Sequence, residues 1–269
     1  MVDKAHKETD KKLSKLEKEL LQVYKEAYKS IEKEIRKILN NPKFKEGENN
    51  YIFISKLKRF KELQKNIAEE IARINKSNIK EVIKLLDEVS TLNYEFARED
   101  IESKVEGIKW GIINPKTYAE VLKEQDNPLF YLAIDDLSER SRIYNNIKKE
   151  LALGLVQGES IPSIAKRIQK VINSNYNSAV RIARTESTRA ENASRLEAFK
   201  HAETLGIKQK KVWIATGDER TRESHQRVNG EMVDLNKPFS NGLMYPGDPA
   251  GDSKEVINCR CAMTTEIVN

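Results

Sequence analysis

Residues 178–216 read SAVRIARTESTRAENASRLEAFKHAETLGIKQKKVWIAT, and the change from helix to strand within this stretch decides the fold. From Ser178 to Leu205 the chain contains neither glycine nor proline, which favours a long helix. Gly206 follows at the position where a helix commonly ends in the left-handed conformation. The β-branched and aromatic residues of Lys211–Thr216 then favour a strand. The stretch predicts a long helix packed on a short sheet.

Two further short strands are expected after this stretch, at Glu231–Val233 and Cys261–Thr265. The fold class is therefore predicted to be α+β and predominantly α. An elongated part made of long helices precedes a small C-terminal domain in which the long helix lies against the short sheet.

The N-terminal part of the chain has the pattern of long amphipathic helices. Within Ala5–Leu39, apolar residues recur at spacings of three and four among lysines and glutamates, up to a stop at residues 40–42. Two further helices are predicted at Tyr51–Ile74 and Ile79–Glu106, with residues 77–78 as a cap between them.

A narrow apolar stripe cannot form a core by itself, so each of these helices must lie against another helix. The partner is either another helix of this chain, in an antiparallel bundle, or another protein. In the second case, Leu20 and Ile31 are the predicted partner-binding residues. We therefore divide the chain into a long-helix bundle or coiled-coil assembly region (1–106), a helical connector (107–150) and a C-terminal domain (151–269).

The connector begins where glycines, a tryptophan and a proline interrupt the helical pattern, at Gly107–Pro115. A helix is predicted at Ser138–Leu155. Another begins after Ser160, which is placed as its N-cap, and ends near Ile172. The asparagine-rich residues 173–177 are expected to separate that helix from the next one.

The composition is polar, with 38% hydrophobic and 33% charged residues and a net charge of +6. No apolar run is long enough to span a bilayer, and the N-terminus lacks the apolar core of a signal peptide. Synthesis in the cytoplasm is expected. The surplus of positive charge is small and permits contact with nucleic acid without establishing it.

The most distinctive residues follow one another between Ala183 and Cys261. In chain order they are Ala183-Arg184-Thr185-Glu186, Arg189, Ala190, Asn192, Trp213, Asp218-Glu219-Arg220-Thr221-Arg222, His225, Gly230, Phe239, Pro246-Gly247-Asp248-Pro249 and Asn258-Cys259-Arg260-Cys261. In order and spacing this series resembles the C-terminal domain of tailed-phage head morphogenesis proteins. That family is named after the F protein of phage Mu and the minor head protein of phage SPP1. The resemblance covers about residues 151–265.

The resemblance implies a non-enzymatic minor capsid protein of a tailed phage or prophage. Such a protein acts in procapsid assembly at the portal vertex, with the portal protein and other head proteins as partners. It self-associates or takes its copy number from the portal. It is made in the host cytoplasm, ends in the capsid interior of the virion, and can contact packaged double-stranded DNA.

Several residues of the series are interpreted as structural. These are Arg184, Thr185, Glu186, Trp213, Asp218, Arg220, Arg222, His225, Cys259 and Cys261. The acids and arginines are expected to form an ion network around a turn, and Trp213 is expected to be buried.

Thiolate and imidazole groups are the usual ligands of zinc, so His225, Cys259 and Cys261 are candidate metal ligands, with Asp218 as a fourth. A two-residue step along an extended chain points both cysteines to the same side, toward His225. We expect no cofactor, with simple packing of the cysteines; bound zinc is the alternative. The two readings stay open at the level of sequence.

A basic group at the end of the long helix is the candidate for contact with DNA. It consists of Lys208, Lys210, Lys211, Arg181 and Arg189. Stacking aromatic residues are not interleaved with it, so binding would be non-specific and sensitive to salt. A solvated charged face is the alternative.

Two other classes of function compete with the head protein. One is a metal-dependent enzyme or toxin-like module in the C-terminal domain, although Ser224-His225-Gln226 and Asn258-Cys259-Arg260-Cys261 do not match the H-x-E and P-C-x-x-C signatures of zinc deaminases. The other is a non-specific DNA-binding protein.

Overall fold

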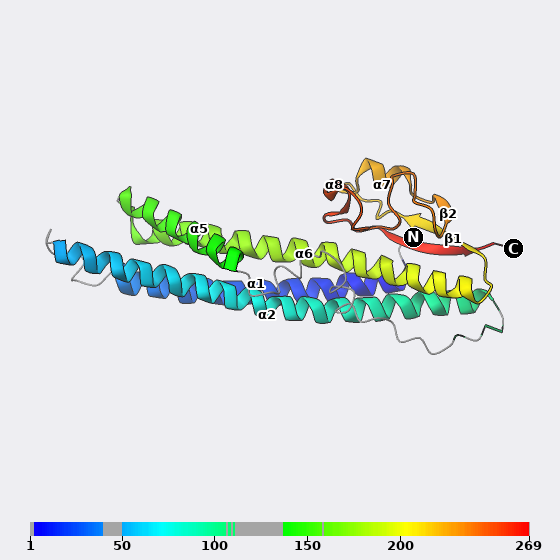
Figure 1. Ribbon diagram of the computed structural model, residues 1–269, viewed down its shortest axis with the longest axis horizontal. Helices are drawn as coiled ribbons and strands as arrows, with labels where there is room; N and C mark the ends of the chain where they lie inside the picture. The colour runs from blue at the N-terminus through cyan, green and yellow to red at the C-terminus, as the bar shows by residue number, and fades with distance from the viewer. Residues whose placement is uncertain are drawn as a thin grey trace. The chain divides into compact units, whose positions relative to one another are not determined.

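The computed structural model describes residues 3–39, 50–105, 107–108, 110, 137–157 and 159–268. The long helices are α1 (Lys4–Leu39), α2 (Asn50–Lys104), α5 (Leu137–Val156) and α6 (Ile161–Thr204). The strands are β1 (Gln209–Ile214), β2 (Met232–Asp234) and β3 (Ala262–Ile267), joined by the short helices α7 (Glu223–Arg227) and α8 (Ser253–Val256) (Figure 1). The fold is α+β and predominantly α, as the sequence predicts. Within the described part of the chain, no helix is long and apolar enough to cross a membrane.

Two predicted helix breaks are wrong, because α2 and α6 each continue through them. Asn78 is buried within α2 and no glycine or proline interrupts Asn50–Lys104, so packing outweighs a weak capping preference. In α6, the side-chain amide of Asn175 donates to the carbonyl of Val171 at 2.8 Å. This bond to the preceding turn lets an asparagine remain inside the helix.

The predicted helix ends near Ser160 and Gly206 are confirmed. The backbone amide of Ser163 donates to Oγ of Ser160 at 3.4 Å, which caps the start of α6. At the other end, Gly206 has φ +89°, and the amide of Ile207 donates to the carbonyl of Ala202 at 3.1 Å. This is the hydrogen-bond pattern of a Schellman C-cap.

By their internal packing, the residues form two compact units. Unit 1 comprises Met1–Leu16, Glu81–Asn127 and Arg181–Asn269, and unit 2 comprises Glu17–Lys80 and Pro128–Val180. Each unit therefore combines residues from all three regions into which the sequence analysis divides the chain. The domain boundaries at residues 106 and 150 stay a prediction.

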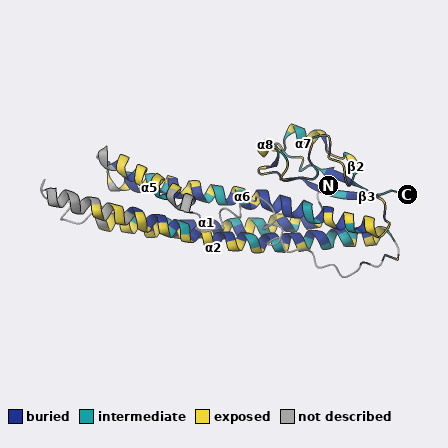
Figure 2. Ribbon diagram, in the orientation of Figure 1, coloured by how far each residue is buried: buried dark blue, intermediate teal, exposed yellow. Residues whose placement is uncertain are grey.

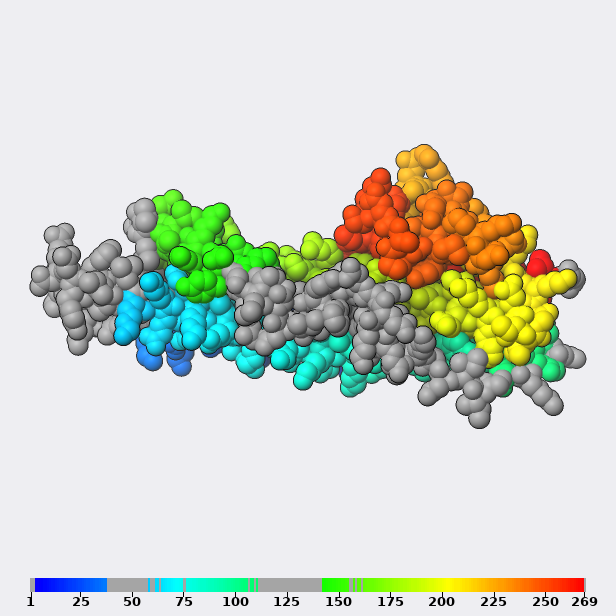
Figure 3. All heavy atoms as spheres, viewed as in Figure 1, coloured from blue at the N-terminus to red at the C-terminus, as the bar shows by residue number. Residues whose placement is uncertain are grey.

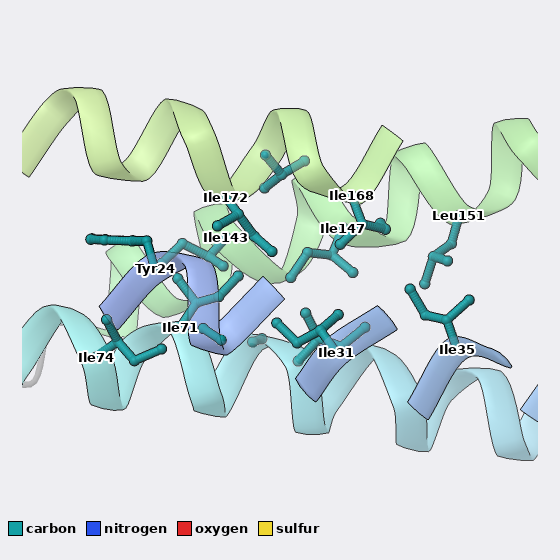
Figure 4. Close-up of a cluster of buried hydrophobic side chains, with 14 of the residues drawn as sticks. Tyr24, Ile31, Ile35, Ile71, Ile74, Ile143, Ile147, Leu151, Ile168 and Ile172 are labelled. Carbon is teal, nitrogen blue, oxygen red and sulfur yellow. The ribbon is translucent and has the colours of Figure 1, made fainter. Parts of the chain in front are cut away.

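Unit 2 is a helical bundle with an isoleucine-rich core. Its buried residues come from α1, α2, α5 and α6 and include Tyr24, Ile31, Ile71, Ile147 and Ile168 (Figure 4). Leu20 and Ile31 are only 2% and 3% exposed. The interpretation of these two residues as a partner-binding surface is therefore wrong, because the chain's own helices cover them.

Unit 1 contains the sheet, with strand order β2-β1-β3 and both pairings antiparallel. Strand β1 pairs Trp213 with Met263 of β3 and Val212 with Met232 of β2. Buried residues are densest along the C-terminal half of α6, which belongs to this unit (Figure 2). In the space-filling view the C-terminal residues, orange to red, form a compact body beside the yellow end of α6 (Figure 3).

The core of unit 1 differs from the sequence prediction in one respect. Tyr94, Ala97 and Ile101 of α2 pack with Phe199 of α6 and Met263 of β3. The end of α2 therefore belongs with the sheet and α6, although the sequence pattern placed it in the N-terminal bundle.

Candidate metal centre and the contacts that hold it

Helix α6 holds the segment that carries both cysteines. The hydroxyl of Thr188 donates to the backbone carbonyl of Cys259 at 2.5 Å. One turn further along α6, the side-chain amide of Asn192 donates to the carbonyl of Cys261 at 3.1 Å. Residues four apart lie on the same face of a helix, so these two side chains fix the backbone of both cysteines from one side.

The residues around the cysteines are fixed as well. Asn258 has φ +56°, a left-handed conformation that asparagine tolerates. Its backbone amide donates to Oγ1 of Thr185 at 3.1 Å. Arg260 binds both oxygens of Asp218, at 2.6 and 2.7 Å, and its carbonyl accepts from Thr216 at 2.6 Å. The turn after β1 is thereby tied to the segment before β3.

His225 lies on the short helix α7 and is 1% exposed. The guanidinium of Arg222 donates to the carbonyl of Ile257, which attaches α7 to the chain just ahead of the cysteines. The imidazole ring packs edge-on against Trp213, with the ring centres 5.2 Å apart. These contacts fix the position of the imidazole.

His225, Cys259 and Cys261 meet in one buried group, which we call the Cys-His centre. Nδ1 of His225 lies 3.6 Å from Sγ of Cys259 and 3.5 Å from Sγ of Cys261. The three ligand atoms lie within 4.8 Å of one another, and the two cysteines are 1% and 2% exposed. Nε2 of His225 lies 3.1 Å from a carboxylate oxygen of Glu255, without the alignment of a hydrogen bond.

The two thiols are electrostatically unequal. A hydrogen bond from Cys259, together with His225, holds the pKa of Cys261 below its usual range. The same bond between the thiols, with burial, raises the pKa of Cys259. The two thiols therefore titrate as a pair, in which ionisation of one opposes ionisation of the other.

The structure does not bring Asp218 into this group. Both its oxygens bind Arg260, and Oδ1 also accepts from Thr221 at 2.9 Å. These contacts, led by the hydrogen bond from Arg260, lower the pKa of Asp218. Glu255 lies beside His225 instead. No local pattern distinguishes Glu255 from the many other glutamates of the chain.

Other residues of the motif series contact the same region of α6. Arg189 donates to Glu186 at 2.9 Å and to the carbonyl of Gly247 at 3.2 Å. Arg184 and Arg220 are exposed. Gly247 has φ +86°, and a Cβ at this position would lie 3.0 Å from the backbone nitrogen of Arg189.

Gly247→Ala is therefore expected to lower the free energy of unfolding by about 2–4 kcal/mol, from left-handed strain and from contact with α6. Gly242→Ala is the matched control, because Gly242 has φ +83° and open space around its Cβ position. The control should cost about 1–2 kcal/mol. Urea denaturation followed by circular dichroism measures both, and equal losses would mean that the close approach to α6 is unimportant.

The predicted basic group is split by the fold. Lys208 and Arg181 are exposed and Lys210 is half-buried. Lys211 is fully buried, and its Nζ donates to the carbonyls of Leu235 and Met244 at 3.1 and 2.8 Å. A contact of Lys211 with phosphate is thus excluded by burial. The guanidinium of Arg189 is also buried, and it binds Glu186 and the carbonyl of Gly247.

Burial lowers the pKa of Lys211 to about 8 from its ordinary value of 10.5. Between these two values the unfolded chain binds a proton at this position and the folded chain does not. The free energy of unfolding should therefore rise as pH increases from about 8 to about 10.5. Denaturation midpoints across this range measure the slope. Lys211→Met should flatten it, and an unchanged slope would contradict the assignment.

A second buried polar group, the Arg195 network, consists of Asp3, Asn93, Glu191 and Arg195. Arg195 is 1% exposed and lies 2.5 Å from Asp3, 2.8 Å from Asn93 and 3.0 Å from Glu191. It also donates to the carbonyl of Met263 in β3 at 2.9 Å. One guanidinium thus connects the first residues of the chain, α2, α6 and the sheet.

His6 adds to this network, since its Nδ1 lies 2.8 Å from Glu191. Burial disfavours the charged imidazole, but the hydrogen bond and charge of Glu191 outweigh it and raise the pKa of His6. Burial likewise opposes ionisation of Asp3, and Arg195 overcomes it and lowers the pKa of Asp3. Sequence reasoning missed this network, because its members lie up to 192 residues apart.

Comparison with known proteins places these features in a family. The profile described as "Phage Mu protein F like protein" matches residues 145–264, which include the Cys-His centre and all of α6. The minor head protein GP7 of Bacillus phage SPP1 is 28% identical over 263 residues, covering 94% of this chain and 83% of that protein. No solved structure matches the chain significantly.

Two further relatives match a shorter stretch. The protein named NAD(+)--arginine ADP-ribosyltransferase EFV, from Enterococcus faecalis, is 36% identical over 132 residues, 48% of this chain. An uncharacterized protein of Haemophilus influenzae is 30% identical over 132 residues, 49% of this chain. The match spans only 27% of the length of each. The family match and the similarity to GP7 along both units lead to one conclusion: the chain carries a Mu F-like region and resembles a phage minor head protein over most of its length.

Proposed function

We propose that this chain is a non-enzymatic head morphogenesis protein that joins the procapsid at the portal vertex of a tailed phage or prophage. The observation that carries the proposal is the similarity to a minor head protein over 94% of the chain, which includes the long helices as well as the Mu F-like region. The portal protein and other head proteins are its partners.

The burial of the apolar stripes bears on how such partners would bind. Tyr24, Ile31 and Ile35 of α1 are covered inside unit 2, so association would use the polar outer faces of the helices. Among the residues whose burial is described, exposed large apolar side chains are scattered, such as Leu21 and Val23 on α1 and Leu153 on α5. Polar faces of this kind suit reversible contacts during assembly.

Co-expression with the portal protein of the same phage tests the proposal. The chain should co-purify with tagged portal rings and co-sediment with them in a gradient. The portal of an unrelated phage serves as the control and should retain none of the chain. Loss of the chain from its own portal under conditions where the rings remain intact would argue against portal association.

A non-enzymatic role is supported by the burial of the Cys-His centre. His225, Cys259 and Cys261 are each at most 2% exposed, so a substrate cannot reach them without opening of the domain. The activity in the name of the Enterococcus protein does not transfer through a match to 27% of its length. Incubation with NAD+ and an arginine-containing acceptor should therefore yield no ADP-ribosylated product.

Contact with packaged double-stranded DNA is proposed only for the exposed part of the basic group, Lys208 and Arg181 with Lys210 at its edge. Such binding should show no sequence preference and should weaken steeply with salt. Replacing Lys208 and Lys210 with glutamine should reduce the slope of affinity against salt, measured by fluorescence anisotropy. A strong preference for one sequence at physiological salt would contradict this part of the proposal.

A further inference from the structure

We propose that the Cys-His centre binds one zinc ion, held by Nδ1 of His225 and the sulfurs of Cys259 and Cys261. This inference goes beyond the role in head assembly and does not depend on it. The ion would lock the segment before β3 onto α7, in the middle of the Mu F-like region.

The spacing of the donor atoms carries the proposal. Zinc–sulfur bonds of about 2.3 Å and zinc–nitrogen bonds of about 2.0–2.1 Å at a tetrahedral angle place sulfur and nitrogen about 3.6 Å apart. The two Sγ atoms lie 3.6 and 3.5 Å from Nδ1 of His225. Both distances agree with two ligands of one tetrahedral ion, and the sulfur–nitrogen donor set is the one that zinc prefers.

The surroundings of His225 share one feature with those of a metal-bound imidazole, a carboxylate near the second ring nitrogen. A histidine that ligates a metal commonly has a carboxylate beside its other ring nitrogen, which sets the tautomer and the ring orientation. Here a carboxylate oxygen of Glu255 lies 3.1 Å from Nε2, on the side of the ring away from the sulfurs. The same carboxylate accepts from the hydroxyl of Ser224 at 2.6 Å, which steadies it.

The backbone of the centre is arranged before any ion binds. Thr188 and Asn192 fix the carbonyls of the two cysteines, and Arg260 between them is anchored on Asp218. A preorganised site loses little conformational entropy when the ion binds. The three protein donors leave the fourth tetrahedral position to water, and the burial of the centre keeps substrates away from the ion.

Zinc content of the full-length chain, purified under reducing conditions from cells grown with added zinc, gives the direct test. We expect about one zinc per chain, with loss of the ion to a strong chelator accompanied by a fall in the melting temperature. Cys261→Ala and His225→Ala should carry close to no zinc and should not respond to the chelator. Arg227→Gln is the matched control, because it removes an exposed ion pair with Glu223 on the same helix as His225 and should keep its zinc.

Cobalt(II) gives a second measurement that needs no variant to fold. Added to the chelator-treated wild-type protein, it should produce the charge-transfer absorption of cobalt–thiolate bonds, and zinc should displace it. Absence of zinc and of this absorption in folded, reduced protein would overturn the proposal and leave a packed thiol–imidazole contact. Neither result involves head assembly, so failure here is distinct from failure of the proposed function.

Discussion

Arg195→Met should lower the free energy of unfolding by about 3–5 kcal/mol, because it removes one partner from a buried set of charges and leaves the others uncompensated. Glu191 is 1% exposed at its side chain, and among the residues that the structure describes it would keep only His6 as a cationic partner. Asn93 and the carbonyl of Met263 would also lose their donor. Chemical denaturation monitored by circular dichroism measures the loss.

The matched control is Arg73→Met in α2. Arg73 pairs with Glu70 three residues earlier at 2.7 Å, but its side chain is 70% exposed. An exposed pair of this kind contributes little to stability, because solvent screens the charges. Hydrogen exchange adds a local measurement, since release of Asp3 and His6 in the Arg195 variant should raise exchange at the start of α1. Equal stability losses in the two variants would refute the central place of Arg195 in unit 1.

Trp213→Ala should cost about 3–5 kcal/mol, the range for truncating a large aromatic residue in a packed core. Trp213 is fully buried in β1, with ring centres 5.2 Å from His225 and 5.1 Å from Phe239. Val228 and Leu243 pack in the same cluster. The cavity would open beside the Cys-His centre and loosen α7.

Met232→Ala on β2 is the control for this variant, since Met232 is 46% exposed in the neighbouring strand. Its loss should stay within about 0.5 kcal/mol, as for most exposed substitutions. Thermal and urea denaturation of both variants give the comparison. Near-wild-type stability of Trp213→Ala would mean that this cluster does not form the core around the centre.

Local signals in the sequence sufficed for the fold class and for the elements that carry the centre. The capping glycine at 206 and the β-branched run after it predict the end of α6 and the strand β1, apart from a shift of two residues. The two-residue step between Cys259 and Cys261 predicts that both sulfurs face His225. These features depend on neighbours in the chain, which a sequence shows directly.

The errors arise where distant packing outweighs local preference. Asn78 and Asn175 suggested helix breaks, but tertiary contacts and a bond to the preceding turn keep both inside helices. The pairing of Arg195 with Asp3 joins residues 192 apart, and no local pattern announces it. Lys211 looked like a surface cation because a sequence does not show that its side chain points into the core.

The composition of assembled heads tests the role in morphogenesis most directly. Procapsids and virions of the phage or prophage that encodes the chain should be purified and analysed by quantitative mass spectrometry. The account predicts the chain in both particles, at a copy number far below that of the major capsid protein, and malformed or fewer heads when its gene is disrupted. Absence of the chain from both particles while it is abundant in the lysate, together with normal head yield after disruption, would contradict the account.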